Sequence, residues 1–250
     1  MSYTTLARSF LPGMRPPAQG HDPAGGEAMP AGFTIRLAHD DERTAAGALL
    51  AERYAWRGYR TVTLPRDQTG WRTTLTAHGH GDAPIGTLTL ELDGGPEGLS
   101  AAAAFGPEVD AMRARGLRLA EFTRLAVDTG VHSTRVLAGL FHVGYIVAHR
   151  LRACDTLLLE VNPRHVRFYE RMLGCQVVGS ERVHPGVQAP AVLLSAPFAY
   201  IRAQIRAHAG TAELAGNSRS LYPFAFSAAK EGGILARLLQ AQQRADATAH

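Results

Sequence analysis

The chain contains 250 residues, of which 46% are hydrophobic and 19% are charged, and this size and composition indicate one soluble globular domain with extensions. The formal net charge is +4 and almost every basic residue is arginine, which reflects either a genomic bias or an acidic partner surface; no basic run or aromatic–basic pattern indicates nucleic-acid binding. The chain has no apolar run of about 18 residues for a membrane span, no export signal and too few cysteines for a disulfide framework, so a reduced, cytoplasmic location is expected.

The N-terminal half predicts a strand, a helix, a hairpin and a short helix. Residues 1–31 are rich in Pro and Gly without hydrophobic periodicity, so they are expected to form a disordered leader. Asp40 or Asp41 can cap the first helix, and the turn signal H-G-H-G-D separates the two hairpin strands. A loop or short helical approach precedes the second helix. The elements are expected over residues 33–37, 40–54, 71–78, 84–92 and 108–115.

The C-terminal half predicts an alternation of strands and helices. A strand with strict alternation is followed by a helix, a continuous apolar strand, and a second helix that Asn162 caps and Gly174 ends. Two more strands and a helix complete a domain over residues 32–209, and residues 210–250 are expected to be a helical extension. The elements are expected over residues 117–127, 133–152, 156–161, 163–173, 176–183, 191–196, 200–209 and 228–243.

Glu121 is the first candidate catalytic residue. It shares a strand face with leucines, Thr123 and Val127, where burial would raise its pKa and suit it to act as a general base. Such a base is needed before an α-ammonium group can attack a thioester. The alternative is a structural ion pair with Arg124. Alternation places Arg124 on the opposite face, although a strand bulge would undo that argument.

Tyr169 and Asn162 are the next candidates. The Tyr169 phenol could protonate a departing thiolate, but its spacing from Val166 and Met172 also fits a core stripe. Asn162 and the amides after it could bind a carbonyl oxygen or phosphate, or simply cap the helix. The histidines show no metal-ligand grouping, so no metal site is predicted.

Several blocks resemble one enzyme group. E-F-T-R-L-A-V-D, residues 121–128, is similar to the E-x-x-R block of the acyl-homoserine-lactone synthases. L-L-L-E-V-N-P-R-H-V-R-F-Y-E-R-M-L-G, residues 157–174, is more similar to the bacterial long-chain N-acyl amino acid synthases of the FeeM type, and the late S-L-Y-P-F-A-F fits the synthase family's C-terminal extension. R-Y-A-W-R-G-Y at 53–59 is similar to the Arg/aromatic block that both groups carry near the first helix. The element order resembles the acyl-transfer half of the GNAT fold. The resemblance implies a single α/β GNAT-like domain with a mixed, mostly antiparallel sheet flanked by helices.

The stretch that would bind coenzyme A departs from the GNAT pattern. GNAT acetyltransferases carry a Q/R-x-x-G-x-G/A loop there, whereas this chain has T-G-V-H-S-T-R-V-L-A-G-L at 129–140, without the paired glycines. The resemblance therefore implies that the donor is an acyl group on the phosphopantetheine of an acyl carrier protein, with acyl-coenzyme A as the alternative. No bound cofactor or metal is implied.

The resemblance also implies roles at matching positions. Glu121 would be the base and Arg124 would organise the strand or bind the acceptor or carrier. The strands 119–127 and 156–161 would separate to admit the pantetheine arm, and backbone amides near Leu125 and Val127 would polarise the thioester. Border residues of the entrance would be Arg53, Trp56 and Arg57, and carrier contacts would be Arg135, Arg150 and Arg152.

The predicted reaction is transfer of a fatty acyl group to the α-amine of an amino acid. The alternatives are a coenzyme A-dependent N-acetyltransferase, an acyl-homoserine-lactone synthase, and a non-catalytic GNAT-like module that binds carrier or lipid. Turnover of the purified protein would distinguish an enzyme from a module. The acyl length, the amino acid and the oligomeric state do not follow from the sequence.

Overall fold

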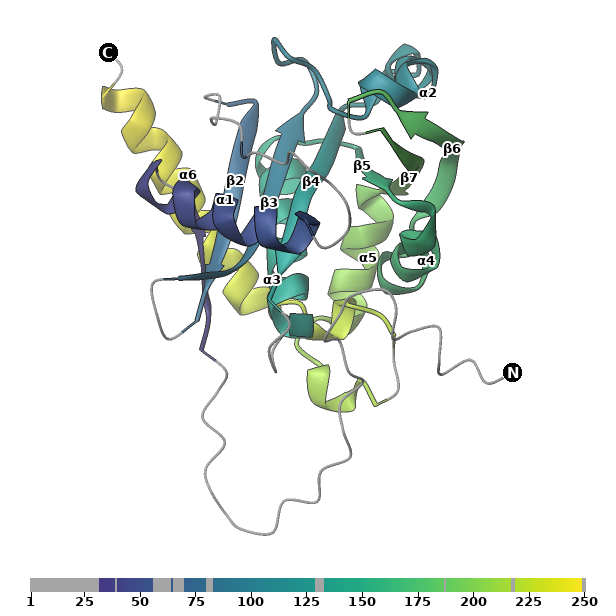
Figure 1. Ribbon diagram of the computed structural model, residues 1–250. Helices are drawn as coiled ribbons and strands as arrows, with labels where there is room; N and C mark the ends of the chain where they lie inside the picture. The colour runs from purple at the N-terminus through teal and green to yellow at the C-terminus, as the bar shows by residue number, and fades with distance from the viewer. Residues whose placement is uncertain are drawn as a thin grey trace.

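A computed structural model describes residues 32–38, 40–55, 64, 70–79, 83–128, 133–186, 188–216 and 219–248. Seven strands form one sheet in the order β1-β2-β3-β4-β5-β7-β6 (Figure 1). Neighbouring strands are antiparallel except β4 and β5, which run parallel. The strands are β1 Thr34–Leu37, β2 Arg72–His78, β3 Pro84–Leu92, β4 Leu119–Val127, β5 Thr156–Val161, β6 Gln176–His184 and β7 Ala189–Pro197.

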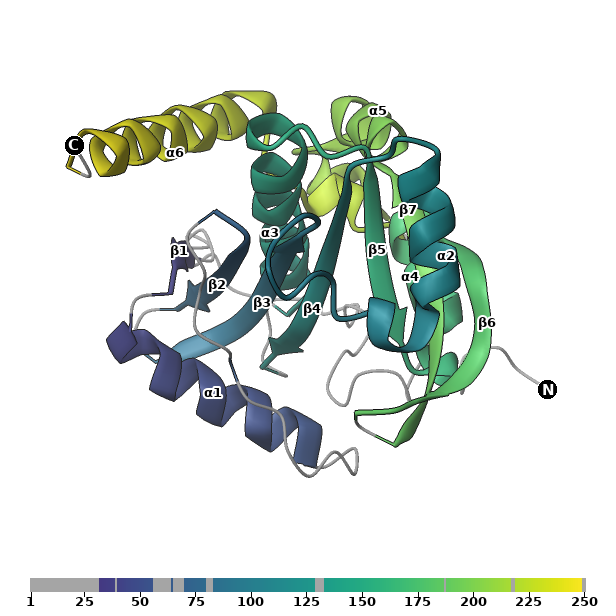
Figure 2. The same cartoon turned by 90° about the horizontal axis from the view of Figure 1, so that it is seen from above.

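Helices cover both faces of this sheet. Figure 2 shows α1 on one side of the sheet and α3 on the other. The helices are α1 Asp40–Ala55, α2 Ala102–Ala114, α3 Ser133–Tyr145, α4 Val166–Leu173, α5 Phe198–His208 and α6 Ala228–Thr248. Shorter turns are the π-helix η2 Ile146–Leu151 and the 3-10 helices η3 Pro163–His165, η4 Ala212–Leu214 and η5 Tyr222–Phe224.

The two faces carry different cores because strand side chains alternate. Phe122, Leu157 and Leu194 belong to the larger core, to which α3 and α5 also contribute. On the other face, Leu158 and Leu193 join the α2 side chains in a smaller core. Toward β2 and β3 that second face is more polar, because buried threonines and Glu91 lie there. The candidate site borders this polar part of the sheet.

The predicted elements match the observed ones with two informative differences. α2 begins at Ala102, earlier than expected, because Phe105 breaks the helical geometry (φ −124°, ψ 33°) and leaves Pro107 in the first turn of a second segment. A proline is tolerated there because its missing N–H would have no partner. The helix expected to run to residue 152 is α-helical only to Tyr145 and then widens into the π-helix η2.

The segment after β7 packs on the same core. The hydroxyl of Tyr222 donates to the carbonyl of Leu173 (2.7 Å), and Glu231 on α6 is paired with Arg150 and lies 3.3 Å from His142 Nε2. These contacts hold the expected C-terminal extension against α3, η2 and the end of α4.

Candidate active site

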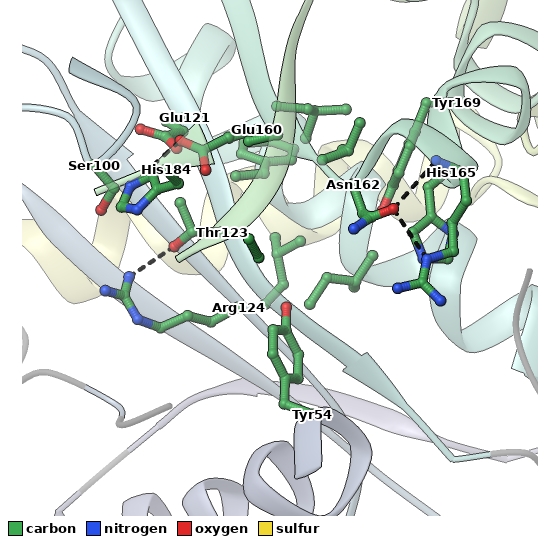
Figure 3. A pocket seen from close by; sticks show the side chains of 18 of the residues that line it. Tyr54, Ser100, Glu121, Thr123, Arg124, Glu160, Asn162, His165, Tyr169 and His184 are labelled. Carbon is green, nitrogen blue, oxygen red and sulfur yellow. Dashed lines mark hydrogen bonds and ion pairs between the residues drawn. The ribbon is translucent and has the colours of Figure 1, made fainter. Parts of the chain in front are cut away.

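The sheet opens between β4 and β5. Their parallel pairing runs from Leu119 opposite Thr156 to Glu121 opposite Leu158 and then ends, while β5 continues to pair with β7 as far as Val161. The separation that the sequence predicted for these strands is therefore present. A cavity of about 330 Å³ occupies this wedge and is lined by β4, β5, β7 and the helical segment after β5 (Figure 3).

A bulge in β4 accompanies the opening. Thr87 pairs with Ala126 and Thr89 with Thr123, so the partner strand has one residue fewer than β4 between these pairs. Arg124 takes up the difference with a left-handed φ of 49°. The expected strict alternation is consequently wrong beyond Thr123, and Arg124 reaches the face that Glu121 and Glu91 share.

Glu121 lies at the closed end of the wedge and is 1% exposed. One carboxyl oxygen accepts a hydrogen bond from the Ala101 amide (2.9 Å), and the residue stands opposite Glu91 in the sheet register. Burial, and then the negative charge of Glu91, raise the pKa of Glu121 well above its ordinary value, as the sequence suggested. Both effects favour the neutral acid, which donates a hydrogen bond but does not accept a proton, so they weigh against its predicted role as a base.

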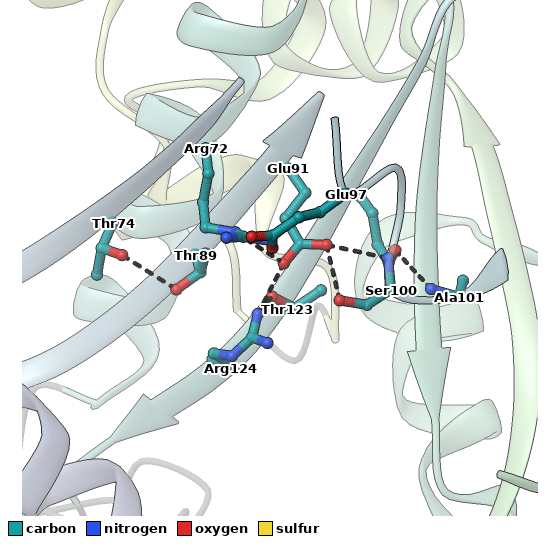
Figure 4. A network of polar contacts seen from close by, with 10 residues as sticks. Arg72, Thr74, Thr89, Glu91, Glu97, Ser100, Ala101, Thr123 and Arg124 are labelled. Carbon is teal, nitrogen blue, oxygen red and sulfur yellow. Dashed lines mark hydrogen bonds and ion pairs between the residues drawn. The ribbon is translucent and has the colours of Figure 1, made fainter. Parts of the chain in front are cut away.

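Glu91 is the ionised neighbour. Its carboxylate accepts from Arg72 (3.3 Å) and Arg124 (2.8 Å), and from the amide and hydroxyl of Ser100 at 3.0 and 2.7 Å (Figure 4). Burial acts to raise the pKa of Glu91, but the hydrogen bonds of Ser100 and the charge of Arg124 outweigh it and hold the pKa below its usual range. Arg124 therefore forms an ion pair with Glu91, whereas the structural alternative expected from the sequence had Glu121 as its partner.

Glu160 and His184 form a second acid–base pair in the cavity, and sequence reasoning missed both. Glu160 Oε2 and His184 Nε2 lie 3.7 Å apart, with side chains 17% and 14% exposed. Burial raises the pKa of Glu160 to about 7 and lowers that of His184. A glutamate inside an otherwise apolar, doubly covered strand was the available signal for Glu160. No sequence signal placed His184 beside it, because their contact depends on the β5-β7-β6 order.

The opposite end of the cavity holds Asn162 and Tyr169. The Asn162 side chain accepts from the Arg164 amide (3.2 Å), as expected for a helix cap. Tyr169 lines the cavity and also packs edge-on against Phe141 with ring centroids 6.4 Å apart, so both of its predicted placements are combined. Leu125 lines the cavity, whereas Val127 packs against the main core.

The structure describes only one of the three residues that were expected to border the entrance. Arg53 forms an ion pair with Asp128 just beyond β4, and its neighbour Tyr54, which was not singled out, lines the cavity. Trp56 and Arg57 lie outside the described residues.

The three arginines expected to receive a carrier are not together. Arg135 is exposed in the first turn of α3, which follows the open end of β4. Arg150 and Arg152 lie at the far end of that helix, beside the start of β5 where the strands are still paired. Arg150 forms an ion pair with Glu231. Of the three, only Arg135 lies at the end of α3 that follows the open end of β4.

Comparison with known proteins decides the family. The chain matches the family N-acyl amino acid synthase FeeM over residues 45–197, which is more than half of its length. The chain belongs to this family. The structure of FeeM, an N-acyl amino acid synthase from uncultured soil microbes, is 26% identical with a TM-score of 0.58, and the match covers 68% of this chain and 93% of that one.

Two other solved structures are more distant. The acyl-homoserine-lactone (AHL) synthase LasI is 13% identical (TM-score 0.49, 68% and 91% of the two chains), and an acyl-CoA N-acyltransferase from Pseudomonas aeruginosa is 14% identical (TM-score 0.44, 66% and 97%). No match was found among curated proteins. Membership of the FeeM family makes the chain an acyltransferase, an N-acyl amino acid synthase, and the predicted GNAT-like fold is confirmed.

No helix among the described residues is long and apolar enough to cross a membrane. Within the same residues, no group of three or more His, Cys, Asp or Glu side chains could hold a metal ion.

Proposed function

We propose that this synthase moves a long-chain fatty acyl group from the phosphopantetheine arm of an acyl carrier protein to the α-amine of an amino acid. The products are an N-acyl amino acid and the free holo-carrier. The observation that carries the proposal is the wedge between β4 and β5, because its cavity joins acid–base groups on one face of the sheet to apolar side chains on the other. A fatty acyl thioester needs apolar surroundings for its chain and acid–base groups near its reacting carbonyl.

The apolar side of the wedge suits the acyl chain. Phe122 and Phe141 line the main cavity and also a second, apolar cavity between α3, α5 and η5. The second cavity measures about 20 Å³, so a long chain would enter only if side chains around it moved. Tyr222 and Leu221 close its far side, which would make the C-terminal extension a determinant of acyl length.

The polar side suits an amino acid. Glu121, Glu160 and His184 gather at one end of the cavity, and Arg124 and Tyr54 lie along its edge (Figure 3). A carboxylate there can receive the α-ammonium group, and a guanidinium can attract the α-carboxylate. The thioester carbonyl would lie between these groups and the apolar side, against the unpaired edge of β4 near Leu125.

The carrier is the better donor for two reasons. The paired glycines that let a backbone approach a nucleotide diphosphate are missing from residues 129–140. In addition, the chain has a formal charge of +4 and exposes Arg135 beside the wedge, which favours an acidic carrier.

Turnover by the purified protein tests the proposal. The protein is mixed with a long-chain acyl carrier and each amino acid in turn, and mass spectrometry follows the N-acyl amino acid while a thiol reagent follows the free carrier. Equal amounts of both products, dependent on an amino acid, are expected. Carrier binding without product would instead indicate a non-catalytic module.

A further inference from the structure

The acceptor's ammonium group must lose a proton before its nitrogen can attack, and the buried side chains of the cavity differ in their ability to accept it. Glu121 is fully enclosed, accepts a hydrogen bond from the Ala101 amide, and faces the negative charge of Glu91. Burial and the charge of Glu91 favour its protonated form, and they outweigh the amide hydrogen bond, which favours the ionised form. Glu91 is ionised, but its oxygens are already engaged by arginines and Ser100.

Glu160 differs from both. Its Oε2 atom is buried and, among the described residues, has no hydrogen-bond partner. It lines the cavity two residues beyond Leu158, where the pairing with β4 ends, so it stands at the point where the wedge opens. A buried carboxyl oxygen without a hydrogen bond destabilises the folded protein. A bound ammonium group could donate the missing hydrogen bond.

The hydrogen bond from Gly186 favours one tautomer of His184. Its Nδ1 atom accepts a hydrogen bond from the Gly186 amide (3.0 Å), so in the neutral ring the proton sits on Nε2. Nε2 is the atom that faces Glu160 Oε2 at 3.7 Å. His184 therefore presents an N–H toward the carboxyl group, which favours its ionised form without competing for the proton.

We infer that the Glu160 carboxylate accepts the proton of the acceptor's ammonium group, that His184 positions and stabilises this carboxylate before the transfer, and that Glu121 stays protonated throughout the reaction. This inference rests on the proposed function, because it assumes that an amino acid occupies the polar end of the cavity. The inference adds to the proposed function the residue that deprotonates the acceptor amine.

The proposed reaction moves one amine proton to Glu160 and a second to the carrier thiolate. Glu160 carboxylate takes one proton from R–NH₃⁺, and the nitrogen lone pair then attacks the thioester carbonyl. The C–N bond forms, the C–S bond breaks with its electron pair on sulfur, and the second amine proton ends on the carrier thiolate. Glu160 returns its proton to water through the open side of the cavity.

The other charged and titratable groups around Glu160 come from several elements. β7 contributes only Ala189, Pro190 and Ala191 to the lining, so no charge faces Glu160 from that strand. Burial sets the pKa of Glu160 at about 7, which lies near the working pH of a general base. Besides Glu121 and His184, the groups lining the cavity are Tyr54, Arg124, Arg164, His165 and Tyr169.

The pH dependence of kcat/KM with an amino acid acceptor is the main test. Because Glu160 must be ionised, the wild-type rate should rise with pH through about 7. Glu160→Gln should lower kcat by about 10²–10⁴-fold and abolish this rise, leaving only the ionisation of the amine itself. His184→Phe should move the rise to higher pH while preserving much of the rate above it. Glu181→Gln, an exposed change on β6, the strand that also carries His184, is the matched control.

Hydroxylamine supplies the second measurement, because it is largely unprotonated at neutral pH and needs no base. With this acceptor the wild-type rise near neutrality should vanish, and Glu160→Gln should recover to within about ten-fold of wild type. The wild-type comparison needs no variant, so it holds even if Glu160→Gln folds poorly.

Three results would each overturn the inference. They are an unchanged rate and pH profile in Glu160→Gln, loss of the pH-dependent rise in Glu121→Gln instead, and a loss of rate in Glu160→Gln that hydroxylamine does not restore. Absence of N-acyl amino acid from the wild type would overturn the proposed function instead.

Discussion

Three glutamates share one face of the sheet, yet their surroundings give them different charge states. Ser100 and Arg124 lower the pKa of Glu91, burial and Glu91 raise the pKa of Glu121 well above its ordinary value, and burial raises the pKa of Glu160 to about 7. The residue type is the same in all three. Environment alone separates their pKa values, as is usual where neighbouring carboxyl groups titrate apart.

The Glu121→Gln variant tests this separation. Glutamine keeps a carbonyl oxygen for the Ala101 amide and is neutral like the protonated acid, so we expect kcat to fall by less than about ten-fold, with an unchanged melting temperature. Steady-state kinetics with a saturating amino acid give the answer. A loss of about 10²–10⁴-fold in a folded variant would restore Glu121 as the base that the sequence suggested.

Tyr169→Phe should also have a small effect. The ring contacts with Phe141 and Phe168 are retained, and a thiolate leaves without needing a strong acid, so a change in kcat below about ten-fold is expected. Rates with thioester donors of different leaving-group acidity provide the check. A large loss that grows with the basicity of the leaving group would show that the phenol does donate a proton.

At the scale of elements, the sequence predicted the order and approximate bounds of the strands, because hydrophobic alternation and the cap at Asn162 are local signals. It also identified Glu121, which stands in a recognisable motif. It could not predict the bulge at Arg124, since a left-handed φ at arginine is imposed by the neighbouring strand rather than by its own preference. The Glu160–His184 pair was missed for a related reason, because it joins two strands that are distant in sequence.

The attachment of α6 gives a prediction at this scale. Glu231 is 9% exposed and joins α6 to Arg150 and His142, so Glu231→Ala would remove the carboxylate that both donors share. We expect a decrease of about 1–3 kcal/mol in the free energy of unfolding, measured by urea denaturation. Lys230→Ala, an exposed change one residue earlier, should have no effect. Equal stability of the two variants would mean that α6 is not held by this cluster.

At the scale of the molecule, the proposed function has the donor and acceptor on opposite sides of the opening between β4 and β5, and the open end is followed by the first turn of α3. Arg135→Glu should therefore raise KM for the acyl carrier by several-fold while leaving KM for the amino acid almost unchanged. Arg115→Glu, which reverses an exposed charge at the closed end, is the matched control. An equal effect of both variants would indicate a response to net charge alone.

The choice of donor tests the central claim most directly. The measurement is kcat/KM for a long-chain acyl carrier and for the matching acyl-coenzyme A, with the same amino acid, at low and high salt. We expect the carrier to be used at least about ten-fold more efficiently, with a preference that weakens as salt screens its attraction to a chain of formal charge +4. Equal use of both donors, without any salt dependence for the carrier, would contradict the account and favour a coenzyme A-dependent N-acyltransferase.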